Sequence, residues 1–481
     1  MEQYLLGIDL GTTGCKSMVF DLEGNIHGKS YIEYDLIFTP EGVEQDAELW
    51  WKHVCETVRK ASAQAGTEKI TALSVSAQGI AGVPVSKDGA PLMNALSWLD
   101  NRSAREMKAL CAEWGEEWLF GQTGKNPGAY TLPQVMWIKE NRPEVFGRMK
   151  RYLLAMDFLM YRMTGKAMTD YSMACGTMAY HIGEKRWLEE ILAQTVGGVF
   201  APLGCMGQRM GNLLPEAARE LGLGENVIVA LGAQDQKCAA LGAGVGPGIA
   251  TISLGTSAAM CSLADSPVRD ERRFVTCCGM DETHWLMETT ISTAGAALKW
   301  MRNTFFENAA YEELSDMAGK SPCGANGVMF FPYFAGIGSR EAAGTFTGIG
   351  LATKKEDMVR AVMEGVSHVL AAHLEHHERV SGAIRALHIF GGGALSGVWR
   401  QMIADMTGKP VVLPATHETG CLGAAVLAAK GAGLIDDIYR PGSLLKAPAC
   451  VTPPDQKNHE AYRAYKSAYQ ILDQSIRKTG I

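Results

Sequence analysis

The chain has 481 residues, of which 47% are hydrophobic and 20% charged, and its formal net charge at pH 7 is −7. This length exceeds what one hydrophobic core serves and predicts two or three domains. The composition is that of a globular enzyme, and the acidic balance argues against nucleic acid or an anionic membrane as a partner.

The N-terminus runs directly into a predicted strand without a basic segment, so no signal peptide is expected, and no uncharged apolar run approaches membrane length. Twelve cysteines are scattered without a Cys-x-x-Cys pair, and only Cys277 and Cys278 are close in sequence. Reduced thiols are therefore favoured over disulfides or a zinc site, and we expect a cytoplasmic protein.

Residues 4–8 and 16–20 read as two β-strands joined by a tight turn rich in glycine and threonine. Such a turn suits a nucleotide, because glycine lets backbone N–H groups approach phosphate oxygens and threonine hydroxyls add neutral donors. Asp9 would repel phosphate directly, so its natural use is to hold Mg²⁺ through the ion's water shell. The alternative is an ordinary hairpin turn with a solvated carboxylate. The residues expected to contact ATP here are Gly11, Thr12, Thr13 and Lys16.

An amphipathic helix is predicted over residues 47–65, with Asp46 as its N-cap, followed by a buried strand over 70–76. A strand end and the start of a helix are expected over residues 96–102. The stretch from about 121 to 223 reads as helical and irregular, and a strand over 227–230 follows it.

Asp235 comes directly after this last strand, in a glycine-rich turn. This position places a carboxylate at the carboxyl edge of a sheet, where α/β proteins bind their ligands. Phosphoryl transfer needs a group that accepts the hydroxyl proton, and a fixed carboxylate can do so. A helix N-cap is the competing interpretation of Asp235, and the two roles are compatible.

The first motif recurs 244 residues later, where Ser253 falls opposite Asp9 and Asp265 falls opposite Asp21. A long-period duplication predicts two similar domains whose phosphate turns face each other across a cleft. Only the first turn carries an acidic residue, so one metal-binding turn and one neutral turn would clamp a triphosphate. The candidate contacts in the second turn are Gly255 and Thr256.

The second half continues the alternation of strands and helices, which predicts an α/β protein. Strands are expected near residues 249–254, 328–334, 386–390 and 410–413, and helices over about 355–380, from 396, over 422–430 and over 455–478. Glycines after the strand at 386–390 allow the backbone to lie flat against a ligand. The nucleotide contacts expected there are Gly392, Gly393 and Ala394.

His373 and His377 stand one helical turn apart, a spacing that can bind a metal. Glu375 fits neither zinc-protease pattern, however, so we expect a solvated helix face instead.

The segments Asp9-Leu10-Gly11-Thr12 and Leu254-Gly255-Thr256 together resemble the two phosphate loops of the actin-like ATPase superfamily. The rest of the chain resembles the FGGY carbohydrate kinases. The family's second signature fits residues 344–349 with 357–364, and its first fits loosely over 131–141. This resemblance implies an α/β fold of two actin-like (ribonuclease H-like) domains with a central cleft, residues 1–246 and 247–481.

The resemblance implies an ATP-dependent kinase that phosphorylates a small sugar or polyol, most simply a ketopentose such as xylulose. It assigns Asp235 as the catalytic base and as a second Mg²⁺ contact beside Asp9, and residues 391–394 as the adenosine turn. The sugar contacts that it implies are Gln78, Asp100, Arg102, Asp235 and Gln236.

Two stretches depart from xylulokinases. Gly79-Ile80 follows Gln78 where they carry Met-His, and the loop over residues 334–343 is shorter than theirs. Both features resemble relatives acting on L-xylulose or on tetritols such as erythritol, so the substrate stays open. Two alternatives belong to other functional classes. One is an actin-like or chaperone-type ATPase, and the other is a catalytically silent sugar sensor. Whether the chain pairs as a homodimer is left open by the sequence.

Overall fold

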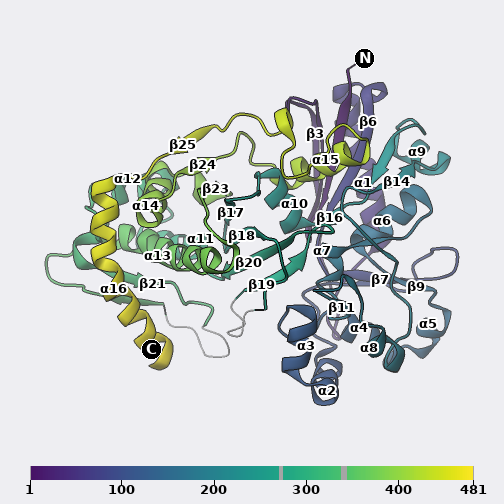
Figure 1. The fold of residues 1–481 in the computed structure, drawn as a ribbon, viewed down its shortest axis with the longest axis horizontal. Helices are drawn as coiled ribbons and strands as arrows, with labels where there is room; N and C mark the ends of the chain where they lie inside the picture. The colour runs from purple at the N-terminus through teal and green to yellow at the C-terminus, as the bar shows by residue number, and fades with distance from the viewer. Residues whose placement is uncertain (1, 270–274, 337–343, 480–481) are drawn as a thin grey trace. The chain divides into compact units, whose positions relative to one another are not determined.

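The computed structural model describes residues 2–269, 275–336 and 344–479, and contacts within the chain divide it into two compact units (Figure 1). The first unit comprises Met1–Gly244, Ala264–Met287 and Glu418–Lys446, and the second comprises Val245–Leu263, Glu288–His417 and Ala447–Ile481. Both units combine helices with a mixed sheet, so the predicted α/β class is confirmed. In the described part of the chain, no helix is long and apolar enough to cross a bilayer.

The central sheet of the first unit has the strand order β14-β15-β6-β1-β2-β3, and the short strand β16 also pairs with β6. These strands are β1 (Tyr4–Leu10), β2 (Gly14–Phe20), β3 (Ile26–Glu33), β6 (Ile70–Ala77), β14 (Arg209–Asn212), β15 (Ile228–Ala230) and β16 (Ala233–Gln234). Strands β1, β15 and β16 run parallel to β6, whereas β2 returns antiparallel to β1. The carboxyl ends of β1, β6 and β16 therefore meet at one edge of the sheet.

Two helices from distant parts of the sequence cover this sheet. Helix α1 (Ala47–Ala65) packs against β2 and β3, and helix α15 (Thr419–Gly431) packs against β1 and β6. Asp46 caps α1 by accepting hydrogen bonds from the backbone N–H groups of residues 48 and 49, as predicted. Helix α15 lies directly on β1, where a Cβ atom at Gly7 would overlap the carbonyl oxygen of Cys421. Glycine at this position therefore sets the close approach of helix and strand.

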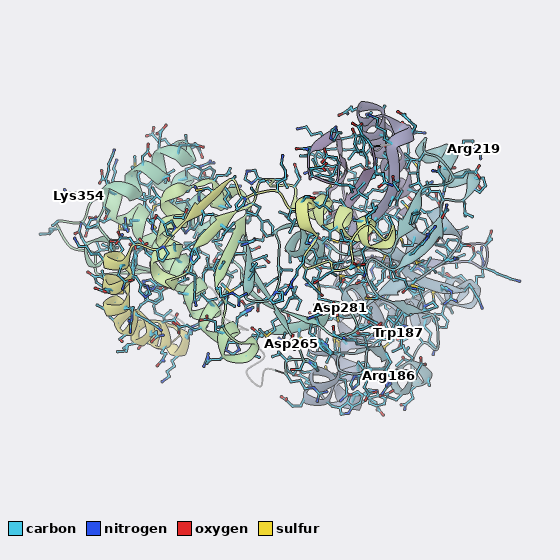
Figure 2. All side chains as sticks on the ribbon, turned by 45° about the horizontal axis from the view of Figure 1, so that its top comes forward. Arg186, Trp187, Arg219, Asp265, Asp281 and Lys354 are labelled. Atoms are coloured by element: carbon cyan, nitrogen blue, oxygen red, sulfur yellow. The ribbon has the colours of Figure 1, made fainter. Side chains whose placement is uncertain are left out.

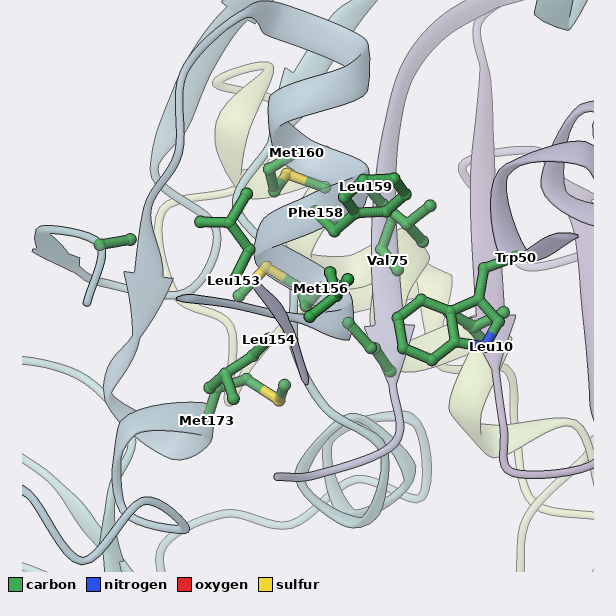
Figure 3. Close-up of a cluster of buried hydrophobic side chains, with 14 of the residues drawn as sticks. Leu10, Trp50, Val75, Leu153, Leu154, Met156, Phe158, Leu159, Met160 and Met173 are labelled. Atoms are coloured by element: carbon green, nitrogen blue, oxygen red, sulfur yellow. The ribbon is translucent and has the colours of Figure 1, made fainter. Parts of the chain in front are cut away.

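The stretch from about 121 to 223 contains short strands as well as the predicted helices. Helix α6 (Ala155–Thr164) is largely buried, and its Met156 and Phe158 belong to one hydrophobic cluster with Leu10, Trp50 and Val75 (Figure 3). The other helices of the first unit are α2 (Ala104–Trp114), α3 (Glu116–Thr123), α4 (Thr131–Asn141), α5 (Pro143–Arg148), α7 (Tyr171–Ala174), α8 (Glu189–Gln194), α9 (Pro215–Leu221) and α10 (Asp235–Gly242). Its other strands are β4 (Ile37–Phe38), β5 (Val43–Gln45), β7 (Gly82–Val85), β8 (Ala95–Leu96), β9 (Arg151–Leu154), β10 (Thr169–Asp170), β11 (Tyr180–His181), β12 (Arg186–Trp187), β13 (Leu203–Gly204) and β19 (Thr276–Gly279).

The sheet of the second unit runs β20-β18-β17-β23-β24-β25. Its strands are β17 (Ile249–Leu254), β18 (Ala258–Ala264), β20 (Trp285–Ile291), β23 (Ala386–Phe390), β24 (Val411–Leu413) and β25 (Cys450–Thr452), with β21 (Met329–Phe331) and β22 (Thr345–Thr347) as a separate pair. The helices are α11 (Gly295–Phe305), α12 (Tyr311–Lys320), α13 (Lys355–Ser381), α14 (Gly397–Thr407) and α16 (Gln456–Thr479). The strands and helices predicted for this half are confirmed, with ends that agree or differ by up to three residues.

The predicted repeat is present in the strand registers, but its second turn is one residue shorter. Leu10 pairs with Cys15 across the first turn, whereas Leu254 pairs with Ala258 across the second, so the offset is 244 before the turn and 243 after it. Ser253 keeps the register position of Asp9, next to the strand parallel to its own. The predicted match of Asp21 with Asp265 is wrong. Asp265 (Figure 2) lies one residue beyond β18, and Ala264 is the structural counterpart of Asp21.

The expected solvated face at His373 and His377 is also wrong. Both side chains point into the second unit and are only 3% and 0% exposed. His377 forms hydrogen bonds through Nδ1 with Ser262 Oγ (2.7 Å) and through Nε2 with Thr289 Oγ1 (3.0 Å). Burial lowers the pKa of both imidazoles to about 3, so they are neutral at pH 7.

Candidate active site

The two predicted functional carboxylates lie on either side of β6, at the edge where the strands end. Asp9 of β1 stands opposite Ser76 of β6, and Ser76 Oγ donates a 2.6 Å hydrogen bond to Asp9 Oδ1. On the other side of β6, Ala233 pairs with the same Ser76, and Asp235 follows two residues later as the first residue of α10. The sheet thus brings together two acidic residues that are far apart in sequence, at the edge where α/β enzymes bind ligands.

Asp9 is enclosed by the start of α15. A Cβ atom at Gly420 would lie 2.9 Å from Asp9 Oδ2, so only glycine leaves room for this carboxylate. Burial raises the pKa of Asp9, and the hydrogen bond from Ser76 and the charge of Lys16 only partly oppose this. Lys16, the cross-strand partner of Asp9, forms a 2.5 Å ion pair with Glu418. Burial lowers the pKa of Lys16, but this ion pair outweighs it, so its pKa is raised overall and the ammonium stays charged.

The phosphate turn after β1 is fixed by side chains from elsewhere in the first unit. Trp98 Nε1 donates a 2.8 Å hydrogen bond to Thr12 Oγ1, and the Tyr34 hydroxyl donates to the Gly11 carbonyl oxygen. The N–H of Gly11 donates to the carbonyl of Gly14 (2.9 Å), so the turn itself uses this donor. Because these hydrogen bonds already fix the turn, its backbone does not have to become ordered when a charged ligand binds.

Gln78 is connected to this turn through a second glutamine. Gln78 Nε2 donates to Gln45 Oε1 (2.9 Å), and Gln45 Nε2 donates to the Thr12 carbonyl oxygen (2.8 Å). Gln78 is 1% exposed, and its Oε1 is a buried atom with no hydrogen-bond partner within the described ranges. A buried acceptor left unpaired costs about 1–3 kcal/mol, so a ligand hydroxyl would be favoured at this place.

Asp100 and Arg102 bind each other. Asp100 is fully buried, and both of its carboxylate oxygens accept hydrogen bonds from Arg102 Nε (2.9 Å each), while Oδ2 also accepts from the Val43 N–H (2.7 Å). Arg102 Nη2 pairs with Glu44 (2.9 Å), and its guanidinium stacks over the Trp137 ring at 4.9 Å. Buried charges need such partners. The network therefore holds the loop after β8, which carries the tryptophan that contacts the phosphate turn.

The carboxylate of Asp235 is oriented by its two neighbours in sequence. Asp235 Oδ1 accepts a 2.7 Å hydrogen bond from the Gln236 N–H and a second from Gln234 Nε2. The N–H of Gln234 in turn donates to Ser172 Oγ (3.0 Å). These hydrogen bonds fix the orientation of the carboxylate, and a general base must be oriented toward the proton that it accepts.

The second unit contains a separate pocket of about 580 Å³, a size that suits a small-molecule ligand. It is lined by Gly255, Thr256, Gly295, Ala296, Leu298, Lys299, Tyr311, Glu312, Ser315, Asp316, Met363, Gly392, Gly393, Leu395, Ser396, Gly397 and Trp399. Four of the predicted nucleotide residues therefore line one cavity. Ala394 is fully buried and is not among the lining residues.

Backbone contacts shape this pocket. Gly391 has a φ of 92°, and Cβ atoms at Gly391 and Gly393 would lie 2.9 and 2.7 Å from atoms of Leu254 at the end of β17. These glycines let the turn pack against the strand, whereas Gly392 has nothing within 4 Å of a Cβ position and faces open space. The Gly295 N–H donates to the Gly255 carbonyl (2.9 Å), which joins the start of α11 to the second phosphate turn.

Several residues of the site carry no recognisable signal in the sequence. Ser76, Tyr34, Glu418 and Gly420 reach Asp9, Lys16 or the first phosphate turn from positions up to about 400 residues away. Only strand pairing and helix packing bring them there. Within the described ranges, no three His, Cys, Asp or Glu side chains form a group that could hold a metal ion. Of the loop predicted over 334–343, residues 337–343 lie outside the described ranges.

Comparison with known proteins adds independent findings. A model of the FGGY family of carbohydrate kinases, N-terminal domain, matches residues 4–242, and one of the C-terminal domain matches residues 250–432. A xylulose kinase from Staphylococcus epidermidis is 30% identical, covering 98% of this chain and 97% of that protein. A crystal structure of gluconate kinase from Lactobacillus acidophilus has a TM-score of 0.91 at 24% identity, covering 100% of this chain and 99% of that chain. A ligand-bound xylulose kinase from the same species has a TM-score of 0.90 at 24% identity, with 99% of both chains covered. These structures establish the expected two-domain, actin-like fold.

Proposed function

The chain belongs to the FGGY family of carbohydrate kinases, and we propose that it transfers the γ-phosphate of ATP to a hydroxyl of a ketopentose such as xylulose. The observation that carries this proposal is the placement of Asp9 and Asp235 on either side of Ser76, at the carboxyl edge of one sheet. The name of the Staphylococcus epidermidis relative supports xylulose as the acceptor.

In this proposal Asp235 accepts the proton of the sugar hydroxyl that attacks the γ-phosphate. Its Oδ1 is held by two N–H groups, so the carboxylate is oriented before the sugar arrives. The loop that carries Trp98 and the buried Asp100–Arg102 pair would form the wall of the sugar pocket, with Gln78 and Gln236 beside it. Gln78 offers an unpaired carbonyl oxygen to a sugar hydroxyl.

The residues around Asp9 fit a magnesium ion. Mg²⁺ is usually held by one or two carboxylates together with waters and phosphate oxygens, and a cation beside Asp9 would favour the ionised form that burial disfavours. Asp9, through water, and Asp235 would hold the ion. When bound, Mg²⁺ would neutralise charge on the phosphates during transfer.

The nucleotide would use residues of both phosphate turns. We assign the nucleoside to the pocket lined by Gly392 and Gly393, and the phosphates to the turns at residues 11–13 and 255–256. Lys16 would assist there as a charged neighbour of the first turn. The sequence division that corresponds to these roles is 1–246 for the sugar and base, and 247–481 for the nucleoside.

A second candidate substrate is L-xylulose or a tetritol such as erythritol, because Gly79 and Ile80 differ from the xylulokinase pattern. A screen of ketoses, aldoses and polyols in a coupled ADP assay decides between them. We expect the highest kcat/KM with a ketopentose. A higher value with erythritol would favour the second candidate, and ADP release that does not respond to any acceptor would contradict both.

A further inference from the structure

The side-chain amide of Gln234 has one paired and one unpaired polar atom at the point where the reaction is proposed to occur. Its Nε2 donates a hydrogen bond to Asp235 Oδ1. Its Oε1 is buried and has no hydrogen-bond partner among the residues that the structure describes. One end of the amide group therefore contacts the proposed base, and the other end presents a buried acceptor next to it.

The amide of Gln234 is held in place from several sides. Gln234 pairs with Ala77 at the end of β6, and its N–H donates to Ser172 Oγ (3.0 Å). Ser172 Oγ donates to the fully buried Asp170 (2.6 Å). A Cβ atom at Gly79 would lie 3.1 Å from Gln234 Cγ, so the side chain runs along the backbone that follows β6. This fixed geometry orients the amide before any ligand binds.

A second buried carbonyl oxygen lies in the same region. Gln78 Oε1 is also unpaired, and Gln78 immediately precedes the glycine that Gln234 lies against. Two unpaired acceptors on neighbouring strand ends call for two donors, and the adjacent hydroxyl groups of a polyol or ketose supply them.

We propose that Gln234 is a positioning and specificity-determining residue. Its Nε2 orients the Asp235 carboxylate through the hydrogen bond to Oδ1, and its Oε1 accepts a hydrogen bond from an acceptor hydroxyl adjacent to the one that is phosphorylated. This inference rests on the proposed function, because it takes Asp235 as the base and a polyhydroxylated compound as the acceptor. It adds that a single amide contacts both one hydroxyl of the acceptor and the group that activates the neighbouring hydroxyl.

Two variants separate these roles from simple packing. Gln234→Glu keeps the shape but replaces the donor with a negative charge, and Gln234→Leu removes both hydrogen bonds. Because the Asp235 carboxylate loses the donor that orients it in both variants, kcat should fall in both while the KM for ATP stays unchanged. The fall in kcat should be on the order of tenfold or more in Gln234→Glu, whose added charge repels the carboxylate, and smaller in Gln234→Leu. Gln194→Glu and Gln194→Leu, at an exposed position of the same unit, are the matched controls and should leave both constants unchanged.

Recognition of the hydroxyl is tested with xylulose and its single-deoxy analogues, or with the best acceptor of the screen. For one analogue, the wild-type kcat/KM should fall by about 5- to 150-fold, because Oε1 is left unpaired. The same analogue should lose much less in Gln234→Leu. This part needs only that the wild type and one variant fold, which thermal melting checks.

An unchanged kcat in both variants, with every deoxy analogue losing equally in wild type and Gln234→Leu, would overturn the inference. If that result came with normal transfer by the wild type and strongly reduced transfer by Asp235→Asn, the proposed function would stand without it. If the wild type phosphorylated no acceptor, both would fall together.

Discussion

Asp235 is the proposed general base, and two N–H groups orient one of its carboxylate oxygens. Asp235→Asn keeps the size of the side chain but removes its basicity. We expect kcat to fall by on the order of 10² to 10⁴, the usual contribution of general-base assistance. Nucleotide affinity, measured by titration calorimetry, should stay nearly unchanged. Turnover at the wild-type rate would rule out Asp235 as the base.

Asp9 and Ser253 share a register position in the two repeats, but only Asp9 is charged. Asp9→Ala should therefore weaken Mg²⁺-dependent transfer severely, since this carboxylate is the group proposed to hold the ion.

Ser253→Ala is the matched control for Asp9→Ala. It removes at most one neutral hydrogen bond, about 0.5–1.5 kcal/mol, and should be mild. The Mg²⁺ dependence of kcat/KM checks both variants. An equal change in the Mg²⁺ requirement would mean that the two turns are equivalent.

At this scale the sequence predicted Asp9 and Asp235 because each stands where an apolar strand meets a glycine-rich turn. It did not predict the hydrogen bond from Ser76 to Asp9 or the one from Trp98 to Thr12, because these contacts follow from strand register and from the path of a distant loop. Asp100 and Arg102 were predicted as sugar contacts, and only the structure reveals that the two side chains pair with each other.

The helices and strands themselves were predicted more completely than the packing contacts between them. The helix over 47–65 and the strands over 249–254 and 386–390 have the predicted ends, because their periodicity and flanking residues are local signals. Helix α15 was predicted as a helix over 422–430, but its packing on β1 was not. That contact depends on Gly7 leaving space for the carbonyl of Cys421, which no local pattern reveals.

The buried Asp157 of helix α6 makes the stability of the protein depend on pH in a way that can be tested. Burial raises the pKa of Asp157 to about 8, although Thr169 Oγ1 donates a 2.6 Å hydrogen bond to it. Between about pH 4 and pH 8, Asp157 is therefore more protonated in the folded chain than in the unfolded chain. Its contribution to the free energy of unfolding falls as the pH rises through this range.

Asp157→Asn, a neutral isostere, should flatten the fall in Tm between pH 5 and pH 8, where 1 kcal/mol corresponds to about 2–4 °C. Thermal melting followed by circular dichroism measures it, with the exposed Asp265→Asn as control. An unchanged slope in Asp157→Asn would argue against a protonated Asp157 in the folded state.

A substitution in the glycine-rich turn after β23 tests whether the nucleoside binds in the pocket of the second unit. Gly392 lines the pocket, and a Cβ atom there meets nothing within 4 Å, so Gly392→Val fills the cavity without a clash at Cβ. The KM for ATP should rise on the order of tenfold, equivalent to about 1.4 kcal/mol, while the KM for the sugar stays constant.

Gly198→Val, at an equally open position in the first unit, is the control for this change and should alter neither constant. Initial-rate kinetics with each substrate varied in turn give both constants. If Gly392→Val left the KM for ATP unchanged, the nucleoside would have to bind elsewhere.

At the scale of the whole molecule, the division of the sequence into two halves differs from the division of the structure into two packed units. The repeat at residues 9 and 253 reveals two related halves, and the division at residue 246 stays a prediction of where they separate in sequence. Packing assigns Ala264–Met287 and Glu418–Lys446 to the first unit, although both come from the second half. These contacts span hundreds of residues, so composition and periodicity carry no trace of them.

The central claim is that the phosphoryl group passes from ATP to a sugar hydroxyl. Phosphorus NMR of the wild-type protein with ATP, Mg²⁺ and xylulose tests it most directly, because the resonances of ATP, ADP, inorganic phosphate and a sugar phosphate are distinct. We predict that a sugar-phosphate resonance grows in step with ADP, and that both grow on the order of 10² to 10⁴ times more slowly when Asp235→Asn replaces the wild type. ADP accompanied by inorganic phosphate, at a rate that xylulose and the other acceptors do not change, would contradict the account.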